Sequence, residues 1–346
     1  MLKLEYSLRF LNPAFLGNAE QQGQWRTPPI KALLRQWWRV AYSADHGHRV
    51  NVDSMRAAEG SLFGVAGDKD DESSRSWIRI RLETWSKGAP AQWTPLPPVR
   101  HPEVNQGSRD IPSDQYLAFG PILTAKKMAP IQALESTTLR LGFDSRVKSA
   151  DRLQIISALT LMNLYGTLGG RSRNGWGSFD LAPLDGTPAL DPLPVTAVFR
   201  DWKEALGCDW PHAMGSGDAP LVWRTQTMTD WRLVMQTLAR IKIALRTQFS
   251  FAGHATPHRS PLGRHWLAYP VTKHDVQGWK GLRMPNTLRF KVRLDGNDAT
   301  RPYAVIFHVP CKPTRDFAPD LNAITKVWTS VHAFLDSRDD LSRIPA

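Results

Sequence analysis

A basic stripe is encoded in the segment RTPPIKALLRQWWR, residues 26–39. Lys31, Arg35 and Arg39 follow one another at intervals of four residues, so a helix would place them on one side. Trp38 would lie at the edge of this stripe, seven residues after Lys31. Single-stranded nucleic acid requires cations beside an exposed aromatic ring, because cations bind phosphates and the ring stacks on a base. A solvated helix face with Trp38 in the core fits the same pattern.

A glycine-rich loop with two arginines is encoded in GGRSRNGWGSF, residues 169–179. Glycines let backbone amides approach a phosphate, and arginines bind it through paired N–H groups. The segment is no Walker loop, because no Gly-Lys-Ser/Thr follows, and no dinucleotide fingerprint, because it follows a predicted helix. A helix end followed by an Asn-Gly turn is the alternative interpretation. The expected RNA-binding residues of this loop are Gly169, Gly170, Arg171, Ser172, Arg173, Asn174, Gly175 and Trp176.

Two further groups of residues have the types needed for catalysis. His254 and His258 are four apart, but Pro257 lies between them and no Glu follows His254, so the zinc-protease motif is absent. The acidic run DKDDE, residues 68–72, is typical of a solvated loop. An alternative function, a metal-dependent or acid–base endoribonuclease, would use His254 or carboxylates of this run as reactive groups. Those carboxylates are Asp68, Asp70 and Asp71.

The composition is that of a folded, basic protein. The chain has 346 residues, 42% of them hydrophobic, which fits two domains of ordinary size. Its 44 Lys and Arg against 32 Asp and Glu give a net charge of +12, which favours a polyanionic partner. The only cysteines, Cys208 and Cys311, indicate neither a disulfide framework nor a zinc site, and they fit a reducing cytoplasm. We expect a cytoplasmic protein that contacts no membrane and needs no cofactor.

The elements that must position these residues follow from hydrophobic periodicity. Alternating apolar residues predict a strand over residues 3–11, and Thr27 is expected to cap a helix that runs to about residue 42. Further strands are expected over residues 77–83, 132–143 and 178–181, with a helix over 151–168. Candidates for the core face of that helix are Leu153, Ile156, Leu159, Leu164 and Leu168. Residues 60–76 are expected to be loop and 89–114 an exposed excursion.

This order of elements predicts a ferredoxin-like βαββαβ domain, and proline-rich residues 182–194 are the expected linker. The fold class is therefore α+β, with two ferredoxin-like (RRM-like) βαββαβ domains in tandem and loop insertions. The expected domains are residues 1–184 and 185–346. In the second domain, helices are expected over residues 198–206, 229–247 and 321–335, and strands over 266–271, 287–294 and 303–309.

Six segments together resemble a known family. They are LRFLNPAFLG (8–17), RTPPIKALLRQWWR (26–39), SLFG (61–64), SRSWIRIRLE (74–83), GGRSRNGWGSF (169–179) and RSPLGRHWLAYPV (259–271). In this order they resemble the Cmr-module RAMP proteins of type III-B CRISPR systems. The sequence departs from the family's usual pattern at Pro29, Ala32 and Trp176. Ala32, in place of the usual Gly, could change how closely RNA approaches the first helix.

The resemblance implies a non-catalytic, RNA-binding subunit that caps the 3′ end of the guide-RNA complex beside other RAMP subunits and contacts guide or target RNA. It carries the family's basic RNA-facing surface over to the matching motif positions. These are Lys31, Arg35, Arg39, Arg171 and Arg173. Trp38, Arg26, Arg259 and Arg264 complete the expected RNA-binding set. A single-stranded RNA binder that joins no complex is a third candidate function.

Overall fold

The chain is described by a computed structural model, which groups it into two compact units. The residues described are 3–20, 22–67, 73–89, 93–104, 109–121, 129–184, 186–190, 195–251, 256–296, 298 and 300–344. The first unit comprises Met1–Thr94, Ala118–Val198 and Lys291–Arg293, and the second comprises Pro95–Leu117, Phe199–Phe290 and Leu294–Ala346. The division expected between residues 184 and 185 falls inside the first unit. Residues 95–117 group with the second.

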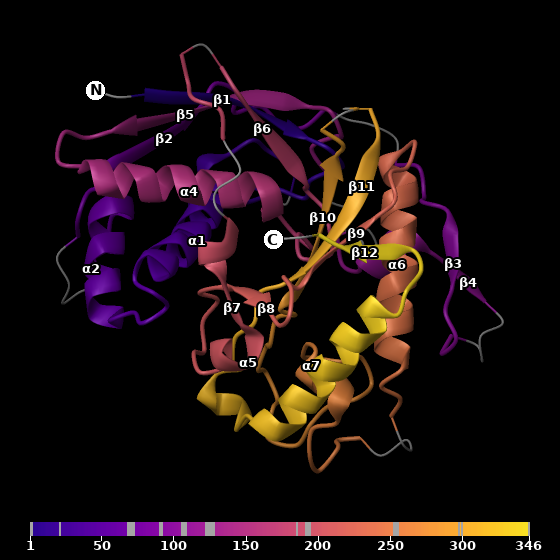
Figure 1. The fold of residues 1–346 in the computed structure, drawn as a ribbon. Helices are drawn as coiled ribbons and strands as arrows, with labels where there is room; N and C mark the ends of the chain where they lie inside the picture. Colours follow the sequence, from indigo (N-terminus) through magenta and orange to yellow (C-terminus); the bar gives the residue numbers. More distant parts are fainter. Residues whose placement is uncertain are drawn as a thin grey trace. The chain divides into compact units, whose positions relative to one another are not determined.

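The first unit has the topology of a ferredoxin-like domain (Figure 1). Its elements are β1 (Lys3–Phe10), α1 (Thr27–Asp45), α2 (Val52–Phe63), β2 (Ile78–Leu82), β5 (Ser136–Phe143), α4 (Ser149–Tyr165), β6 (Phe179–Pro183) and the short helix η2 (Val195–Val198). The strands form one sheet in the order β2-β5-β1-β6, and every neighbouring pair is antiparallel. Without α2, this is the βαββαβ arrangement that the sequence predicts.

Period-2 alternation along β1 fixes the register of this sheet. Leu4, Tyr6, Leu8 and Phe10 are buried, while the residues between them face outward, as predicted. Tyr6 lies opposite Leu139 of β5, which is also buried. Helices α1 and α4 pack against each other on the same side of the sheet, and their apolar faces form the core with these strands (Figure 1).

Helix α2 lies where the sequence analysis expected loop. Asn51 accepts a hydrogen bond from the Ser54 amide at 2.9 Å, which caps the helix at its start. Met55, Leu62 and Phe63 are buried on one side. The expectation of a loop from residue 60 is therefore wrong for its first four residues, because α2 packs against α1.

The core face of α4 also differs from the expectation. Leu159 and Leu168 are buried, but the side chain of Leu153 is 65% exposed. The buried face is set by the contact with α1, where the Trp37 and Tyr165 rings are 6.0 Å apart. Leu153 is therefore wrong as a core residue, and the buried face is formed by Ile155, Ala158, Leu159, Leu161 and Met162.

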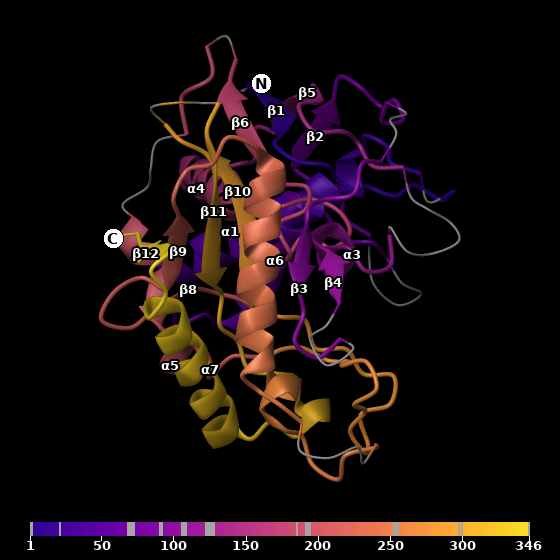
Figure 2. The same ribbon diagram turned by 90° about the vertical axis from the view of Figure 1, so that its right-hand side faces the viewer.

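The second unit repeats the ferredoxin-like topology (Figure 2). Its main elements are β9 (Val222–Thr225), α6 (Trp231–Thr247), β10 (Leu288–Leu294), β11 (Pro302–His308), α7 (Leu321–Asp336) and β12 (Leu341–Arg343). The strand order is β10-β11-β9-β12, which corresponds to the order of the first sheet. This order of elements and strands is the one that the sequence analysis expects of a second ferredoxin-like domain.

Two expected elements of the second unit are wrong. The helix expected over residues 198–206 is instead a short strand, β7 (Phe199–Asp201), followed by one helical turn, α5 (Trp202–Ala205), and β7 pairs with β8 (Met214–Ser216). The strand expected over residues 266–271 is replaced by the short helix η3 (Gly263–Trp266) and an extended segment with an isolated bridge from Tyr269 to Met284. A further short helix, η4 (Arg315–Phe317), precedes α7.

The inserted segment 95–117 is more ordered than an exposed excursion. It contains β3 (Pro98–Arg100), β4 (Asp110–Pro112) and the short helix α3 (Ser113–Leu117). Val99 and Leu117 are buried, and Gln236 of α6 donates a hydrogen bond to the Pro98 carbonyl at 3.0 Å. The β3–β4 ribbon lies beside α6 (Figure 2). No helix in the described ranges is both long and apolar enough to cross a bilayer.

Candidate nucleic-acid interface

The predicted stripe of cations is present on α1. Lys31, Arg35 and Arg39 are all partly exposed, and the residues that face the core lie between them. Burial and the charge of Arg35 lower the pKa of Lys31, which indicates that the two cations are neighbours. The helix begins at Thr27 with Arg26 at the capping position, but no side-chain cap is formed. The expectation that Thr27 caps the helix is therefore wrong.

A buried carboxylate that the sequence analysis missed holds two of these cations. Arg35 Nε and Arg39 Nε each donate to a different oxygen of Glu59 on α2, and Arg39 Nη2 donates to Oε1 at 2.7 Å. The Glu59 side chain is 3% exposed, whereas Arg35 and Arg39 are 41% and 38% exposed. Burial alone would raise the pKa of Glu59, but Arg39 and Arg35 outweigh it and hold this pKa below its usual range.

The triad keeps a net positive charge. Two guanidiniums share one carboxylate, and each arginine still has N–H groups that Glu59 does not use. Glu59 therefore fixes the two arginines in place and leaves part of each guanidinium on the surface. Such preorganised donors lose less side-chain entropy when they bind a phosphate.

Trp38 does not lie beside the stripe as an exposed ring. Its side chain is 0% exposed and packs against Tyr42 and Phe63, with ring centroids 5.0 and 5.8 Å away. Phe63 belongs to α2, so the helix that the sequence analysis missed also covers this tryptophan. The expectation that Trp38 is exposed for base stacking is wrong.

The glycine-arginine loop is fixed by a residue from another motif. Asn12 is fully buried; its Nδ2 donates to the Gly175 carbonyl at 2.8 Å, and its Oδ1 accepts from the Ser178 amide at 2.9 Å. The Gly170 amide donates to the Phe15 carbonyl at 2.9 Å. The segments LRFLNPAFLG and GGRSRNGWGSF therefore form one local structure, which gives the loop a defined shape.

The glycines of this loop have different roles. A Cβ atom at Gly177 would come within 1.9 Å of the Leu168 carbonyl oxygen, and one at Gly169 within 2.7 Å of the Phe15 carbonyl oxygen. Both also have positive φ, at +65° and +94°, so the fold itself requires them. At Gly170 a Cβ would meet nothing closer than 3.5 Å, which is ordinary contact. The fold therefore does not require a glycine at residue 170, and the space where a side chain would lie is available to a ligand.

The exposed aromatic near the loop is Phe119, not Trp176. Trp176 is 0% exposed and packs against Phe15 at 5.3 Å, so the expectation that it stacks on a base from the surface is wrong. Phe119 is 61% exposed, and the Arg171 guanidinium lies over the neighbouring Gly120, where a Cβ would be 3.3 Å from Nη2. The cation therefore lies beside the residue that follows an exposed aromatic, which is the kind of combination that single-stranded nucleic acid binds. Phe119 lies within no motif, so no pattern in the sequence singles it out.

The stripe and the loop belong to the same unit, and α1 contacts the segment that leads into the loop. The Leu33 side chain on α1 lies beside Gly166, where a Cβ would be 3.1 Å from Leu33 Cδ2. Gly166 directly follows α4 and precedes the loop by three residues. The first half of α1 therefore packs against the end of α4, from which the glycine-arginine loop continues.

The remaining expected residues are placed differently from one another. Ser172, Arg173 and Asn174 are partly exposed in the loop, and the Ser172 carbonyl accepts from Thr167 Oγ1 at 3.0 Å. Arg26 Nη1 donates to the Gly17 carbonyl at 2.7 Å. In the second unit, Arg259 is exposed, but Arg264 is 8% exposed and donates to Glu103. These two residues do not belong to the surface of the first unit.

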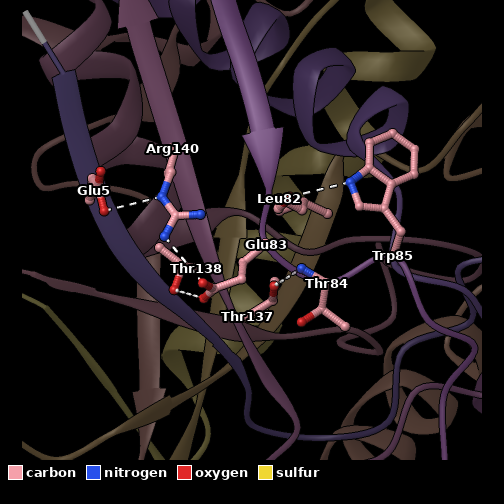
Figure 3. A network of polar contacts seen from close by, with 8 residues as sticks. All are labelled: Glu5, Leu82, Glu83, Thr84, Trp85, Thr137, Thr138 and Arg140. Carbon is pink, nitrogen blue, oxygen red and sulfur yellow. Dashed lines mark hydrogen bonds and ion pairs between the residues drawn. The ribbon is translucent and has the colours of Figure 1, made fainter.

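The outer face of the first sheet is not the RNA-binding face of a typical RRM. In that mode, aromatic rings on the two central strands stack on bases. Here no aromatic side chain faces outward from β1 or β5, both of which the structure describes in full. Arg140 instead donates to Glu5 at 3.2 Å and to Glu83 at 3.3 Å, linking three strands (Figure 3). Thr138 also donates to Glu83 at 2.7 Å.

Among the described residues, no group of three or more His, Cys, Asp or Glu is placed to hold a metal ion. Residues 68–72, with Asp68, Asp70 and Asp71, and also His254, lie outside the described residues. His258 is described, and its Nε2 lies 3.1 Å from His274 Nδ1.

Comparison with known proteins supports the fold. No protein-family model and no curated protein sequence matches the chain. Among solved structures, Cmr1 from Pyrococcus furiosus in its apo form matches 99% of this chain and 98% of its own, with a TM-score of 0.52 and 16% identity. A chain of the type III-B Cmr-β complex bound to cognate target RNA and AMPPnP matches at a TM-score of 0.48 and 11% identity, over 95% and 99% of the two chains. The chain therefore has the fold of Cmr1, as the motif resemblance implies.

Proposed function

We propose that the chain is a structural, RNA-binding subunit of a type III-B CRISPR effector complex, which caps the 3′ end of the guide RNA and contacts guide or target RNA. Its partners are that RNA and the neighbouring RAMP subunits in the cytoplasm. The fold shared with Cmr1 over nearly the whole of both chains supports this context. Because folds host many functions, we infer RNA binding from the surface of the first unit.

The observation that carries the proposal is the set of donors on that surface. Arg35 and Arg39 are held by Glu59 with part of each guanidinium exposed, and Lys31 extends the row. In the anchored loop, Arg171 lies over Gly120, which directly follows the exposed Phe119. Cations in fixed positions and an exposed ring bind the backbone and bases of a single strand without reading its sequence.

We further propose that the chain does not itself cut RNA. In the alternative, a metal-dependent endoribonuclease, the carboxylates of residues 68–72 or His254 would be reactive. Purified protein is incubated with labelled guide and target RNA, with and without magnesium. We expect binding without cleavage, and cleavage by the purified chain would overturn the non-catalytic assignment.

The role in assembly has a separate test. The chain is mixed with neighbouring RAMP subunits and guide RNA, and the mixture is resolved by size-exclusion chromatography. We expect the chain to co-elute with these subunits.

The acidic run is tested in the reconstituted complex. We expect a complex that contains the variant Asp68→Ala/Asp70→Ala/Asp71→Ala to cleave target RNA at the wild-type rate. Loss of cleavage with intact assembly would make the acidic run catalytic.

The RNA interface is tested with Arg171→Ala/Arg173→Ala. Arg56→Ala is a matched control, because Arg56 is exposed on α2 of the same unit. We expect the double variant to bind single-stranded RNA more weakly, while the control binds like wild type. Wild-type binding by the double variant would make the loop a turn without a role in RNA binding.

A further inference from the structure

Two arginines and a tyrosine meet where the inserted segment packs on α6. Tyr116 lies on α3, Arg246 lies in the last turn of α6, and Arg264 lies in η3. Lys242, one turn before Arg246, places its Nζ 5.7 Å from the centre of the Tyr116 ring. The His101 and Tyr116 rings are 5.5 Å apart. All of these residues belong to the second unit.

Three polar atoms of this cluster have no partner. Tyr116 Oη, Arg246 Nε and Arg264 Nε have almost no exposed surface, and none finds a hydrogen bond within the part of the chain that the structure describes. A buried polar atom without a partner costs free energy, so native proteins seldom leave several together. Three in one cluster indicate a partner that the protein alone does not supply.

The charges of the cluster do not balance. Arg264 Nη1 donates to both oxygens of Glu103 at 2.7 and 2.8 Å, which uses the cluster's carboxylate. Burial raises the pKa of the Tyr116 hydroxyl, and Arg246, Arg264 and Glu103 also influence it. Burial lowers the pKa of Arg246, and Arg264 is the cation that adds to this effect. Two guanidiniums therefore share one carboxylate.

The cluster is accessible from solvent on one side. Glu103 is 39% exposed, whereas Arg264, to which it is bonded, is 8% exposed. Tyr116 and Arg246 are partly exposed, although the orphan atoms themselves are covered. The cluster therefore lies just beneath the surface, and an anionic group would approach it where Glu103 is exposed and Tyr116 and Arg246 are partly exposed.

We propose that Tyr116, Arg246 and Arg264 form a binding site for a phosphate group of an RNA strand. Guanidinium N–H groups and a hydroxyl are the donors that phosphate oxygens accept from. The net positive charge of the cluster requires an anion, and Glu103 positions Arg264 for it. The choice of RNA as the phosphate carrier rests on the proposed function, but none of the three residues is among those on which that proposal depends.

The test uses Tyr116→Phe and Arg246→Gln in the full chain. Arg240→Gln is the matched control, because Arg240 is exposed on the same helix. Binding of a labelled single-stranded RNA is followed by fluorescence anisotropy over a range of salt concentrations. We expect each variant to weaken binding roughly tenfold, the effect of one lost hydrogen bond to a charged group. Arg246→Gln should also reduce the salt slope by about 0.7, whereas Tyr116→Phe should leave it unchanged.

A second readout separates a binding role from a structural one. Arg246 has a covered N–H without a partner, so Arg246→Gln should leave the melting temperature of the free protein unchanged or raise it. Inorganic phosphate at constant ionic strength should raise the melting temperature of wild type and of Arg240→Gln, but not of Tyr116→Phe or Arg246→Gln. A lower melting temperature for free Arg246→Gln would make this arginine structural and would overturn the site.

The outcomes distinguish this site from the proposed function. If wild type binds RNA and both variants bind it equally well with an unchanged salt slope, the phosphate site is wrong and the proposed function stands. If wild type binds no RNA, the proposed function fails. If phosphate then still raises the melting temperature of wild type but not of the two variants, the phosphate site stands. If an acidic peptide raises the melting temperature and phosphate does not, the phosphate site is wrong.

Discussion

Replacement of Arg39 by Met should harm both the stability of the first unit and RNA binding, and a second substitution should separate the two effects. Arg39 gives Glu59 two hydrogen bonds, from Nε and from Nη2, whereas Arg35 gives one. Arg39→Met therefore leaves a carboxylate that is 3% exposed with one partner. Arg39→Met/Glu59→Gln removes the buried charge as well.

The size of the effect follows from burial. Removal of one partner from a fully buried ion pair costs about 3–5 kcal/mol. Arg39 is 38% exposed, so solvent reduces this value, and Arg35 remains bonded to Glu59. We expect a loss of about 2 kcal/mol for Arg39→Met, or roughly 4–8 °C in Tm for a unit of this size. The double variant should recover at least half of that loss.

The assay compares thermal unfolding with RNA binding for the same proteins. Both variants should lose one phosphate contact, so the salt slope should fall by about 0.7 in each. Lys31→Ala is the comparison, because no ion pair is described for Lys31, and it should lower the slope equally without a change in Tm. A double variant as unstable as Arg39→Met would refute the role of Glu59. Unchanged RNA binding in all three proteins would remove the stripe from the interface.

Three further outcomes are expected. Phe119→Ala should weaken binding of single-stranded RNA by about 1–3 kcal/mol at an unchanged salt slope, since stacking is lost but no charge; wild-type affinity would exclude stacking. Gly170→Ala should fold normally and bind RNA less tightly, whereas Gly177→Ala should lower Tm because its Cβ would meet the Leu168 carbonyl at 1.9 Å; equal Tm values would contradict this. Burial lowers the pKa of His332 to about 4, whereas the ordinary value is ~6.5. Between these two pH values the unfolded chain binds one proton more than the folded chain, so stability should decline as the pH falls through this window. His332→Gln should reduce the decline measured by urea unfolding, and an unchanged decline would assign it to other groups.

The order of elements in the first unit could be predicted because its strands and helices have strong periodicity. Strand β1 alternates along its whole length, as expected, and α4 is present although it ends at Tyr165, three residues before the expected end. In the second unit, β9 and β12 are only four and three residues long, too short for a periodic signal. They were missed, although the longer α6, β10, β11 and α7 were identified.

The candidate site could be predicted only in part, because tertiary contacts decide which side chains stay on the surface. The spacing of Lys31, Arg35 and Arg39 is local, and one helix is enough to align them. The burial of Trp38 depends on α2, which begins only at Val52, beyond the segment of the stripe, and was not predicted. Glu59 is buried on α2. Glutamates are mostly exposed, so its sequence position does not indicate that it is buried or that it pairs with two arginines. The pairing of Asn12 with Gly175 is equally hidden, because 163 residues separate the two.

The most direct test of the central claim is the salt dependence of single-stranded RNA binding by the full chain. If Lys31, Arg35, Arg39, Arg171 and Arg173 each contact one phosphate, these five contacts should contribute about −3.5 to the slope of log K against log salt concentration, at ~0.7 per contact. The variant Lys31→Ala/Arg171→Ala/Arg173→Ala should then reduce the magnitude of the wild-type slope by about 2.1. A triple variant that binds RNA with the wild-type slope and affinity would contradict an RNA interface on the first unit.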